Sequence, residues 1–554
     1  MRSILITLCL VFLHQFSIGQ CDTNRYVNPI FTSVYKHSNV KYGEAPVWSI
    51  PYYNTDLFMD IYEPIGDLLT KRPLMLWVHP GGFLLGDKEA DDMVALCDSF
   101  ARRGYVTASI GYRLGFNPLS SNSAERAVYR GTQDVRAAIR YLMEYSDVFD
   151  IDTNHIFLGG SSAGGVATLH VAYIDQDEVP TSTEGGVFGN DLGCLDCTGN
   201  TYSHEISLAG IVNMWGAIGD STWIDADETI PALLIHGVED GVVPFGVGHA
   251  FGVSTTPVSH GSRSVHNRLD SLGIDHGFLP FVGQDHEPHG TSNGYFSAPP
   301  TPYWDTIFNA VNDHYFAQLK PNEASVFGDE IVCDNDMVWY SVDINPNESA
   351  CWIVENGTII ENLRDSVLVE WIQGTGSVSA RIKSTLDAVS DESTVSVEIK
   401  ELPNSIFTYV VDGAMVSFDM SSPEISNVDW SFGDYMSGNG QVVEHFFSEE
   451  GSYEVGVSVT GTNACVNQSS QLISVYEGEI RFGIYPNPTE NELHLVNVPK
   501  GAKVIITDAL GKKLMKTKVS ETEVLIEVKD YRAGVYFVTV VYAGDRQTKR
   551  FVKK

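Results

Sequence analysis

Phe157-Leu-Gly-Gly-Ser-Ser-Ala-Gly-Gly165 is the stretch that decides the fold of this chain. It contains the pattern G-x-S-x-G with Ser162 at its centre. The apolar run 155–158 before the pattern is typical of a strand, and the run 166–172 after it is typical of a helix. A tight turn between the two brings backbones close together, so its flanking positions must be glycine. The pattern predicts that Ser162 lies on a strained turn at a helix N-terminus, exposed as a nucleophile.

Strand-like and helix-like patterns alternate around this turn, over residues 42–319. Such alternation predicts an α/β domain with a doubly wound, mostly parallel sheet that has helices on both faces. The expected strands are 74–78, 106–110, 155–158, 208–212, 232–235 and 278–282, and the expected helices are 91–103 and 124–145.

Two consecutive glycines follow the first expected strand, in His79-Pro-Gly-Gly-Phe83. We expect the backbone amides of Gly81 and Gly82, together with that of Ala163, to form an oxyanion hole with three donors. Pro80 has no N–H group, so it cannot contribute. His79 is interpreted as a structural residue that fixes this loop. An ordinary Gly-Gly turn is the alternative interpretation.

A carboxylate follows the buried strand that begins at Pro231. Asp240 lies 78 positions after Ser162. A serine, an aspartate and a histidine in that order along the chain are one of the known arrangements of a catalytic triad. Glu239 competes for the same role, and we prefer Asp240 for its shorter side chain. Both acids could instead be solvated turn residues.

The candidate general base follows the last expected strand. His286 lies on the loop after 278–282, from which an imidazole can reach both a serine and an aspartate. His289 is the reserve candidate. We expect His276, which precedes the strand, to be a surface residue.

Taken together, these motifs resemble the α/β-hydrolase superfamily, in its carboxylesterase and hormone-sensitive-lipase-like branch. The resemblance covers residues 42–319, and that branch usually has glycine where this chain has Pro80. It implies a serine esterase in which Ser162 attacks, His286 moves the proton and Asp240 orients His286, with no metal or organic cofactor. The matching residues are 79–83, Gly111-Tyr-Arg-Leu114, Asp134, 137–139, 160–165 and 236–240, with Arg113 and Asp134 implied to be structural.

The acidic, Gly-rich segment 175–227 lies where such domains commonly insert a cap over the site. We expect a local disulfide between Cys194 and Cys197 to stiffen it. Phe83, Trp215 and Trp223 are candidates for a substrate wall, and core packing explains each of them equally well.

The N-terminal segment indicates that the chain leaves the cytoplasm, and its charge and cysteines are interpreted with that in mind. The formal charge is −36, although the tail 483–554 carries 13 basic and 8 acidic residues. Such an acidic surface makes nucleic acid and strongly acidic substrates poor partners. Residues 1–20 read as a signal peptide, with lipidation at Cys21 a weaker alternative, and no stretch is typical of a transmembrane anchor. In an oxidising compartment cysteines pair, so we expect Cys333 to pair with Cys351, whereas Cys97 is interpreted as a buried thiol.

The chain after residue 322 is expected to be all-β. Residues 322–402 and 403–477 are predicted to be two small β-sandwiches. The second contains Trp430-Ser-Phe-Gly-Asp434 and resembles a PKD-type immunoglobulin-like domain, as the first does more distantly. Spacers and carbohydrate- or surface-binding modules are both open interpretations.

The tail 481–554 contains Ile484-Tyr-Pro-Asn-Pro488, Asp508-Ala-Leu-Gly511 and Tyr531-Arg-Ala-Gly-Val-Tyr-Phe537. It resembles the type A C-terminal sorting domain of type IX secretion. The resemblance implies a third small β-sandwich, recognition by that secretion machinery, and release from the cell or attachment at its surface.

The function predicted from these features is a secreted serine esterase. Its substrate would be an extracellular ester such as an acylated polysaccharide, a polyester or a lipid. A serine peptidase of the prolyl-oligopeptidase type and a non-catalytic surface-binding protein are the alternatives.

Overall fold

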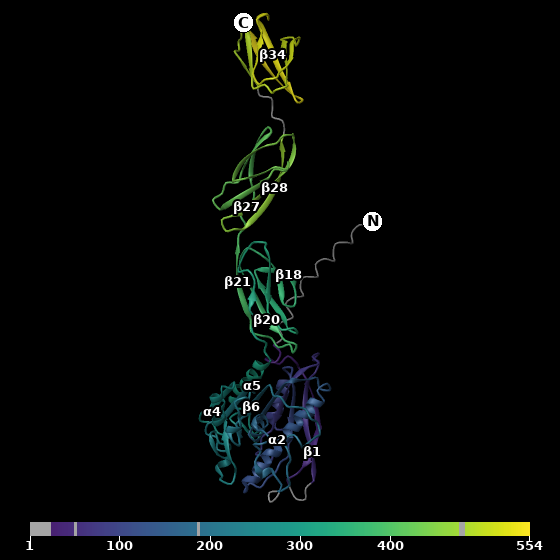
Figure 1. Cartoon of the computed structure of the whole chain (residues 1–554), viewed down its shortest axis with the longest axis vertical. Coiled ribbons are helices and arrows are strands. Elements are labelled where there is room, and N and C mark those ends of the chain that lie inside the picture. Colours follow the sequence, from purple (N-terminus) through teal and green to yellow (C-terminus); the bar gives the residue numbers. More distant parts are fainter. Residues whose placement is uncertain (1–23, 49–52, 186–188, 476–481) are drawn as a thin grey trace, which may run out of the picture.

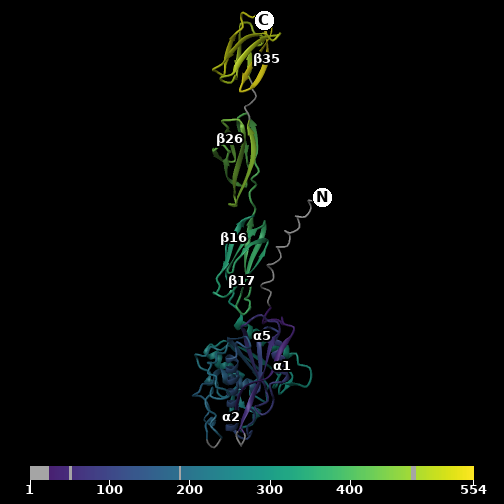
Figure 2. The same cartoon turned by 90° about the vertical axis from the view of Figure 1, so that its right-hand side faces the viewer.

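The computed structural model describes residues 24–48, 53–185, 189–475 and 482–554. An α/β part at the N-terminal side is followed by β-sandwiches that continue from it in line (Figures 1 and 2). The predicted signal peptide at 1–20 and Cys21 lie outside the described residues.

The α/β part is built on an eight-stranded sheet with the order β1-β2-β4-β3-β5-β6-β8-β11. The strands from β4 to β11 run parallel, whereas β1 and β2 pair antiparallel at one edge. The predicted class, a mostly parallel doubly wound sheet, is therefore confirmed. The strands are β1 Val34–Pro46, β2 Asn54–Pro64, β3 Arg72–Val78, β4 Val106–Ile110, β5 Ile151–Ser161, β6 Gly210–Met214, β8 Ala232–Gly237 and β11 His276–Phe281.

Helices cover both faces of this sheet because its central strands are apolar on both sides. In β3, Leu74 and Leu76 face one core while Met75 and Trp77 face the other. Helices α2, α3 and α4 pack on the first face, and α1 and α5 pack on the second. The helices are α1 Asp91–Ala101, α2 Ser121–Glu144, α3 Ala163–Tyr173, α4 Ser262–Leu272 and α5 Tyr303–Leu319.

The segment expected as a cap, 175–227, is shorter than predicted. Strand β6 belongs to the central sheet, so only the chain before Gly210 runs outside the α/β core as a long insertion. Small strands β7 (Ala217–Ile218), β9 (Val247–His249) and β10 (Val258–Gly261) form a separate three-stranded sheet, and β12 (Thr291–Ser292) pairs with β13 (Tyr295–Phe296).

Six further sheets form the C-terminal β-sandwiches. Within 326–400 they are β14-β16-β19-β18 and β15-β21-β20-β17, within 408–475 β22-β23-β26 and β25-β24-β27-β28, and within 483–553 β29-β30-β33 and β32-β31-β34-β35. Trp430 and Phe432 of the W-x-F-G-D motif lie in the core of the second sandwich.

The strands of the three sandwiches have the following bounds. They are β14 Val326–Phe327, β15 Ile331–Cys333, β16 Met337–Val342, β17 Ser349–Glu355, β18 Gly357–Asn362, β19 Ser366–Trp371, β20 Gly374–Lys383, β21 Ser393–Lys400, β22 Thr408–Asp412, β23 Met415–Asp419, β24 Ile425–Ser431, β25 Ser437–Asn439, β26 Val442–Phe446, β27 Gly451–Gly461, β28 Val466–Val475, β29 Gly483–Tyr485, β30 Glu492–Val496, β31 Lys503–Asp508, β32 Lys513–Lys518, β33 Val524–Glu527, β34 Gly534–Tyr542 and β35 Asp545–Lys553.

The first sandwich is attached to the α/β part through the loop between β20 and β21. Leu386 and Ala388 of this loop belong to the core that α1 and α5 cover. The hydroxyl of Tyr26 donates to the carbonyl oxygen of Leu386 at 2.9 Å, and Lys320 forms an ion pair with Asp391. Apolar contacts and polar contacts thus join the two parts.

One disulfide differs from the sequence-based pairing. Cys333 is bonded to Cys465 of the second sandwich, so the predicted pair Cys333–Cys351 is wrong. Cys333 ends β15 near the junction, whereas Cys351 lies within β17 opposite Arg381 and is disulfide-bonded to a different cysteine. Cys97 is a buried free thiol, as predicted. None of the described helices is long and apolar enough to cross a membrane.

The Cys333–Cys465 bond should stabilise the paired sandwiches. Replacing both residues with serine is expected to lower the unfolding free energy of this region by up to about 4 kcal/mol, because a long loop is no longer closed in the unfolded chain. Chemical denaturation of the two proteins measures the difference, with the wild type under reducing conditions as the control. A non-reduced peptide map that links Cys333 to another cysteine would contradict the assignment.

Candidate active site

Ser162 occupies the tight turn between β5 and α3. Its backbone adopts φ 55° and ψ −115°, a strained conformation for a residue with a side chain. A Cβ atom on Gly160 would lie 2.2 Å from the backbone of Gly164, and one on Gly164 would lie 1.9 Å from the carbonyl oxygen of Val78. The flanking glycines are therefore required by the packing of this turn against β3.

His286 and Asp240 meet Ser162 from two neighbouring loops. His286 follows β11 and Asp240 follows β8, and these strands pair in parallel. The Nε2 atom of His286 lies 2.8 Å from Oγ of Ser162, and its Nδ1 atom lies 2.6 Å from Oδ2 of Asp240. The structure thus brings the three sequence-predicted residues into one hydrogen-bonded line.

Backbone amides fix the Asp240 carboxylate in place. Its Oδ1 atom accepts hydrogen bonds from the amides of Val242 and Val243, each at 2.8 Å. Burial acts to raise the pKa of Asp240, but hydrogen bonds from His236 and His286 outweigh it and hold that pKa well below its usual value. The competing acid Glu239 is exposed, so Asp240 is the carboxylate at this position.

His236 is a site residue that the sequence analysis did not identify. Its Nε2 atom lies 3.2 Å from both Oδ2 of Asp240 and the carbonyl oxygen of Val243, so Nε2 carries the hydrogen. Its Nδ1 atom accepts from the hydroxyl of Ser262 at 2.8 Å, and Asn213 donates to that hydroxyl oxygen at 2.9 Å. This network fixes the tautomer of His236, so that its Nε2–H group is a second donor to Asp240, beside His286.

Asp285 ties the two loops together and was also missed. Its Oδ1 atom accepts from the amide of Gly241 at 2.9 Å and from the amide of His286 at 2.8 Å. One carboxylate therefore links the loop that carries Asp240 to the loop that carries His286. Its position directly before His286 was the only signal in the sequence.

The other two histidine candidates lie away from Ser162. The ring of His289 is buried between Trp215 and Trp304, with centroid separations of 4.7 and 5.6 Å. Its Nε2 atom lies 3.5 Å from Oδ2 of Asp92. His276 begins β11 and is half-buried at the surface, with its Nε2 atom 2.7 Å from Nδ1 of His266.

The Gly-Gly loop after β3 adopts backbone conformations that favour glycine. The φ angles are 118° at Gly81 and 60° at Gly82. Within the described part of the chain, no acceptor is found for the amides of Gly81, Gly82 and Ala163. Gly82 and Ala163 line the same cavity as Ser162, whereas Gly81 does not.

His79 holds this loop, as the sequence analysis expected. Its Nδ1 atom lies 2.6 Å from the carbonyl oxygen of Pro80, and its ring stacks on Tyr112 at 4.3 Å. Burial lowers the pKa of His79 to about 4, so the ring is neutral near pH 7. The Tyr112 hydroxyl in turn donates to the His79 carbonyl oxygen at 3.0 Å.

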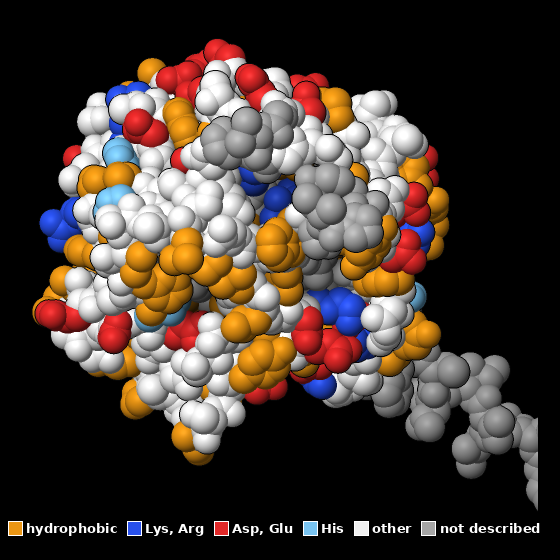
Figure 3. Space-filling model, turned by 90° about the horizontal axis from the view of Figure 1, so that it is seen from below, with side chains coloured by type: hydrophobic (Ala, Val, Ile, Leu, Met, Phe, Trp, Pro, Cys, Tyr) orange, Lys and Arg blue, Asp and Glu red, His pale blue; other side chains and the backbone are white. Residues whose placement is uncertain are grey.

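A mostly apolar cavity of about 370 Å³ opens beside Ser162. Phe83 and Trp223 line it, whereas Trp215 does not. Trp215 is fully buried and donates from its indole N–H to Oγ of Ser161 at 2.9 Å, so it is a core residue and not a wall. At the rim, Phe251 and Val258 are exposed, and hydrophobic side chains gather on the face of the α/β part that is turned away from the sandwiches (Figure 3).

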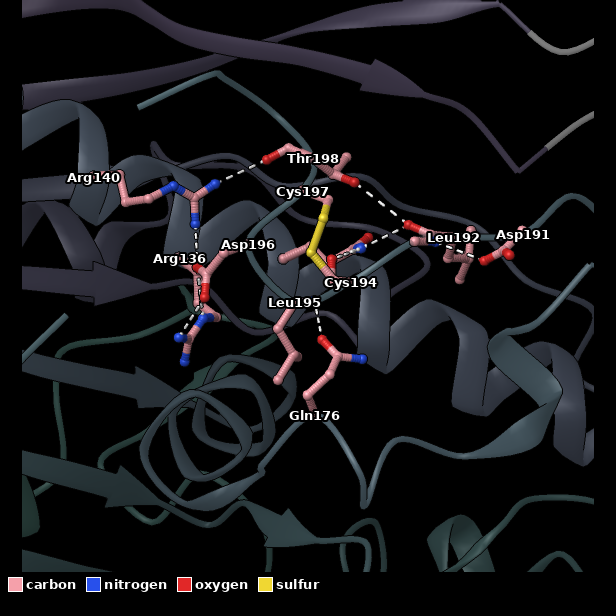
Figure 4. The surroundings of a disulfide bond; sticks show 12 residues. Arg136, Arg140, Gln176, Asp191, Leu192, Cys194, Leu195, Asp196, Cys197 and Thr198 are labelled. Carbon is pink, nitrogen blue, oxygen red and sulfur yellow. Dashed lines mark hydrogen bonds and ion pairs between the residues drawn. A yellow bond between two sulfur atoms is a disulfide. The ribbon is translucent and has the colours of Figure 1, made fainter. Parts of the chain in front are cut away.

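The long insertion is held on α2 by arginines (Figure 4). Cys194 and Cys197 form the predicted disulfide. Asp196 between them forms ion pairs with Arg136, at 2.7 Å, and with Arg140. Residues 141–262 contain no lysine or arginine, so these cations must come from another element.

A cluster of acidic residues surrounds Glu228. Burial and the nearby carboxylates of Asp175, Asp227, Asp225 and Glu178 together raise the pKa of Glu228 to about 7.

Among the described residues, no group of three or more His, Cys, Asp or Glu side chains is arranged to hold a metal ion.

Comparisons with known proteins agree with this architecture. Residues 59–219 match the family model described as BD-FAE, residues 407–475 match the PKD domain, and residues 483–554 match the secretion system C-terminal sorting domain. The chain carries an esterase-type α/β-hydrolase domain, a PKD domain and a secretion sorting domain. The sorting domain indicates export to the cell exterior, as predicted.

Individual relatives share parts of this chain. Carboxylesterase 3B of Mus musculus is 33% identical over 148 residues, which cover 25% of each chain. The secreted lipase of Arthroderma benhamiae is 26% identical over 313 residues, which cover 51% of this chain and 60% of the lipase. This chain therefore spans about a quarter to three fifths of the length of these relatives.

Solved structures that align with part of this chain include esterases. A truncated form of carbohydrate esterase from gut microbiota aligns with a TM-score of 0.34 and 19% identity, over 52% of this chain and 97% of that one. Esterase 2 of Thermogutta terrifontis, phosphoramylated by tabun, aligns with a TM-score of 0.34 and 17% identity, over 50% of this chain and 95% of that one.

Removing the His236 donor should weaken catalysis. We expect His236→Phe to lower kcat/KM for a simple acetyl ester about tenfold, because Asp240 loses a buried hydrogen bond that helps to orient it. His236→Gln, which keeps an N–H donor, should recover part of the loss. Steady-state kinetics on variants with unchanged unfolding temperature provide the measurement. A folded Phe variant with wild-type kcat/KM would show that His236 is dispensable.

Stability should depend on pH through Glu228. Its pKa is higher in the folded chain than in the unfolded chain, so its unfavourable contribution is absent below about pH 4, grows as the pH rises from there to about 7, and is complete above that pH. Glu228→Gln is therefore expected to stabilise the protein by about 1 kcal/mol at pH 8, after allowance for solvent screening, and to have little effect at pH 4. Denaturant unfolding at the two pH values measures this difference, and an equal gain at both would contradict it.

Proposed function

We propose that this chain is a secreted serine esterase that hydrolyses carboxylic esters through an acyl-enzyme. The observation that carries the proposal is that His286 is hydrogen-bonded to both Ser162 and Asp240. A histidine held between a serine and a buried carboxylate is the arrangement that activates a serine hydroxyl.

In the first half-reaction, Oγ of Ser162 attacks the ester carbonyl carbon while Nε2 of His286 takes the hydroxyl proton. The amides of Gly82 and Ala163, with Gly81 as the third proposed donor, stabilise the negative charge on the carbonyl oxygen. Asp240 stabilises the imidazolium. When the C–O bond breaks, His286 gives its proton to the leaving alkoxide, and the acyl group remains on Ser162.

Water completes the second half-reaction. His286 takes a proton from a water molecule as it attacks the acyl carbon, and then returns a proton to Oγ of Ser162 as the carboxylic acid leaves. Asp240 keeps its negative charge throughout, because His236 and two backbone amides hold the carboxylate.

The cavity and the sorting domain support a proposal for the class of substrate. An apolar cavity favours esters whose acyl group is apolar over much of its length. Because the sorting domain indicates export, the substrates that we propose are extracellular esters, such as acylated polysaccharides, polyesters and lipid esters. We propose that the two sandwiches within 326–475 act as spacers between the esterase and the sorting domain, which the secretion machinery recognises.

Ser162→Ala is expected to lower kcat/KM for para-nitrophenyl acetate by about 10⁴-fold or more, because the nucleophile is lost. Wild-type protein should also react with a fluorophosphonate probe, and the variant should not. The Ser396→Ala variant is the matched control, since that exposed serine lies on β21 of the first sandwich. An active alanine variant would refute the proposal, and a preference for peptide amides over esters would favour a serine peptidase.

A further inference from the structure

One buried histidine in the cavity has no part in the proposed mechanism. His170 lies on α3, lines the cavity and is 7% exposed. It is eight positions after Ser162 on the same helix, so it lies about 12 Å from the nucleophile along the helix axis. Only an extended acyl group on Ser162 can reach it.

The hydrogen-bonding state of His170 is fixed by its own helix. Its Nδ1 atom lies 2.7 Å from the carbonyl oxygen of Val166. A carbonyl oxygen only accepts, so Nδ1 carries the hydrogen. Burial lowers the pKa of His170 to about 4, so the ring is neutral near pH 7 and Nε2 presents a lone pair. No donor to Nε2 is present in the part of the chain that the structure describes.

Other polar side chains that line the cavity already use their hydrogens. The Tyr129 hydroxyl donates to the Gly193 carbonyl oxygen at 2.8 Å, and the Thr256 hydroxyl donates to the Val253 carbonyl oxygen at 2.8 Å. The carboxylate of Glu125 accepts from Ser182 at 2.6 Å and has only acceptor capacity. These groups leave the cavity with free acceptors, and a ligand that complements them must donate.

The rest of the wall favours a flat, apolar group. Phe83, Phe116 and Trp223 line the cavity, and the Trp223 ring meets the His170 ring edge-on at 5.8 Å. An apolar ligand that covers Nε2 of His170 without donating to it leaves this acceptor unpaired, which costs free energy that a correctly placed ligand donor recovers.

We propose that His170 is a specificity-determining residue that accepts a hydrogen bond from a hydroxyl or N–H group at the distal end of an otherwise apolar acyl group. This inference rests on the proposed esterase function. It predicts selection between substrates that differ only in this distal donor, because an unpaired buried acceptor penalises the analogue without it.

The test compares two methyl esters, of para-hydroxyphenylpropanoate and para-methoxyphenylpropanoate. For the wild type we expect kcat/KM to favour the hydroxy ester about tenfold. His170→Leu should remove this preference, and His170→Gln, which retains an acceptor, should keep part of it. The ratio of the two kcat/KM values within each protein is the readout, so a general loss of activity does not affect it.

Two further variants identify the acceptor. His314→Leu removes a buried histidine of α5 that does not line the cavity, and the wild-type ratio should persist. Glu125→Gln should also retain it. If Glu125→Gln abolishes the preference and His170→Leu does not, the assignment to His170 is wrong.

The outcomes separate the two proposals. A wild-type protein that fails to hydrolyse para-nitrophenyl acetate refutes the esterase function itself. A wild-type protein that hydrolyses the acetate but shows no preference for the hydroxy ester overturns the role of His170 alone. This second comparison needs no variant, so it decides the question even if both His170 variants fail to fold.

Discussion

The close approach of the Ser162 turn to strand β3 is the constraint on which the catalytic part depends. The α-carbon of Gly164 packs so closely on the Val78 carbonyl that a Cβ atom there would lie 1.9 Å from its oxygen. This contact sets the start of α3, the strained backbone of Ser162 and the position of the loop after β3. The same helix carries His170 into the cavity, so the nucleophile and the proposed specificity residue share one rigid element.

The Asp240 carboxylate is the second group on which the arrangement of the site depends. Its oxygens accept hydrogen bonds from two backbone amides and two imidazoles. Asp285 links the loops on which Asp240 and His286 lie. Each loop follows one of two paired parallel strands, β8 or β11, so their separation follows from sheet geometry. The buried charge is stabilised here because backbone amides and imidazoles donate hydrogen bonds to the carboxylate.

Electrostatics also organise the outside of the α/β part. The long insertion comes from a stretch without basic residues, and α2 supplies the arginines that bind it. Where carboxylates gather without such partners, burial and mutual repulsion raise the pKa of Glu228. The acidic charge of the insertion is therefore compensated at its contact with α2, whereas the carboxylates around Glu228 repel one another.

The sequence by itself determined the fold class and the order of the catalytic candidates, because turn chemistry and strand periodicity depend on neighbouring residues. Ser162, Asp240 and His286 follow strands that can be recognised from their apolar runs. The spacing left His289 open as an alternative to His286, and packing between Trp215 and Trp304 decides that His289 lies elsewhere.

Only the tertiary structure decided the features that depend on contacts between distant segments. The Cys333–Cys465 bond joins two sandwiches across 132 positions, and no local pattern specifies such a pairing. His236 and Asp285 act through hydrogen bonds to loops that other strands position. The free Nε2 atom of His170 likewise becomes an acceptor inside a cavity only when α3, α2 and the segment around Trp223 enclose it. Local sequence sets backbone conformation, but the partners of a side chain are set by which elements pack around it.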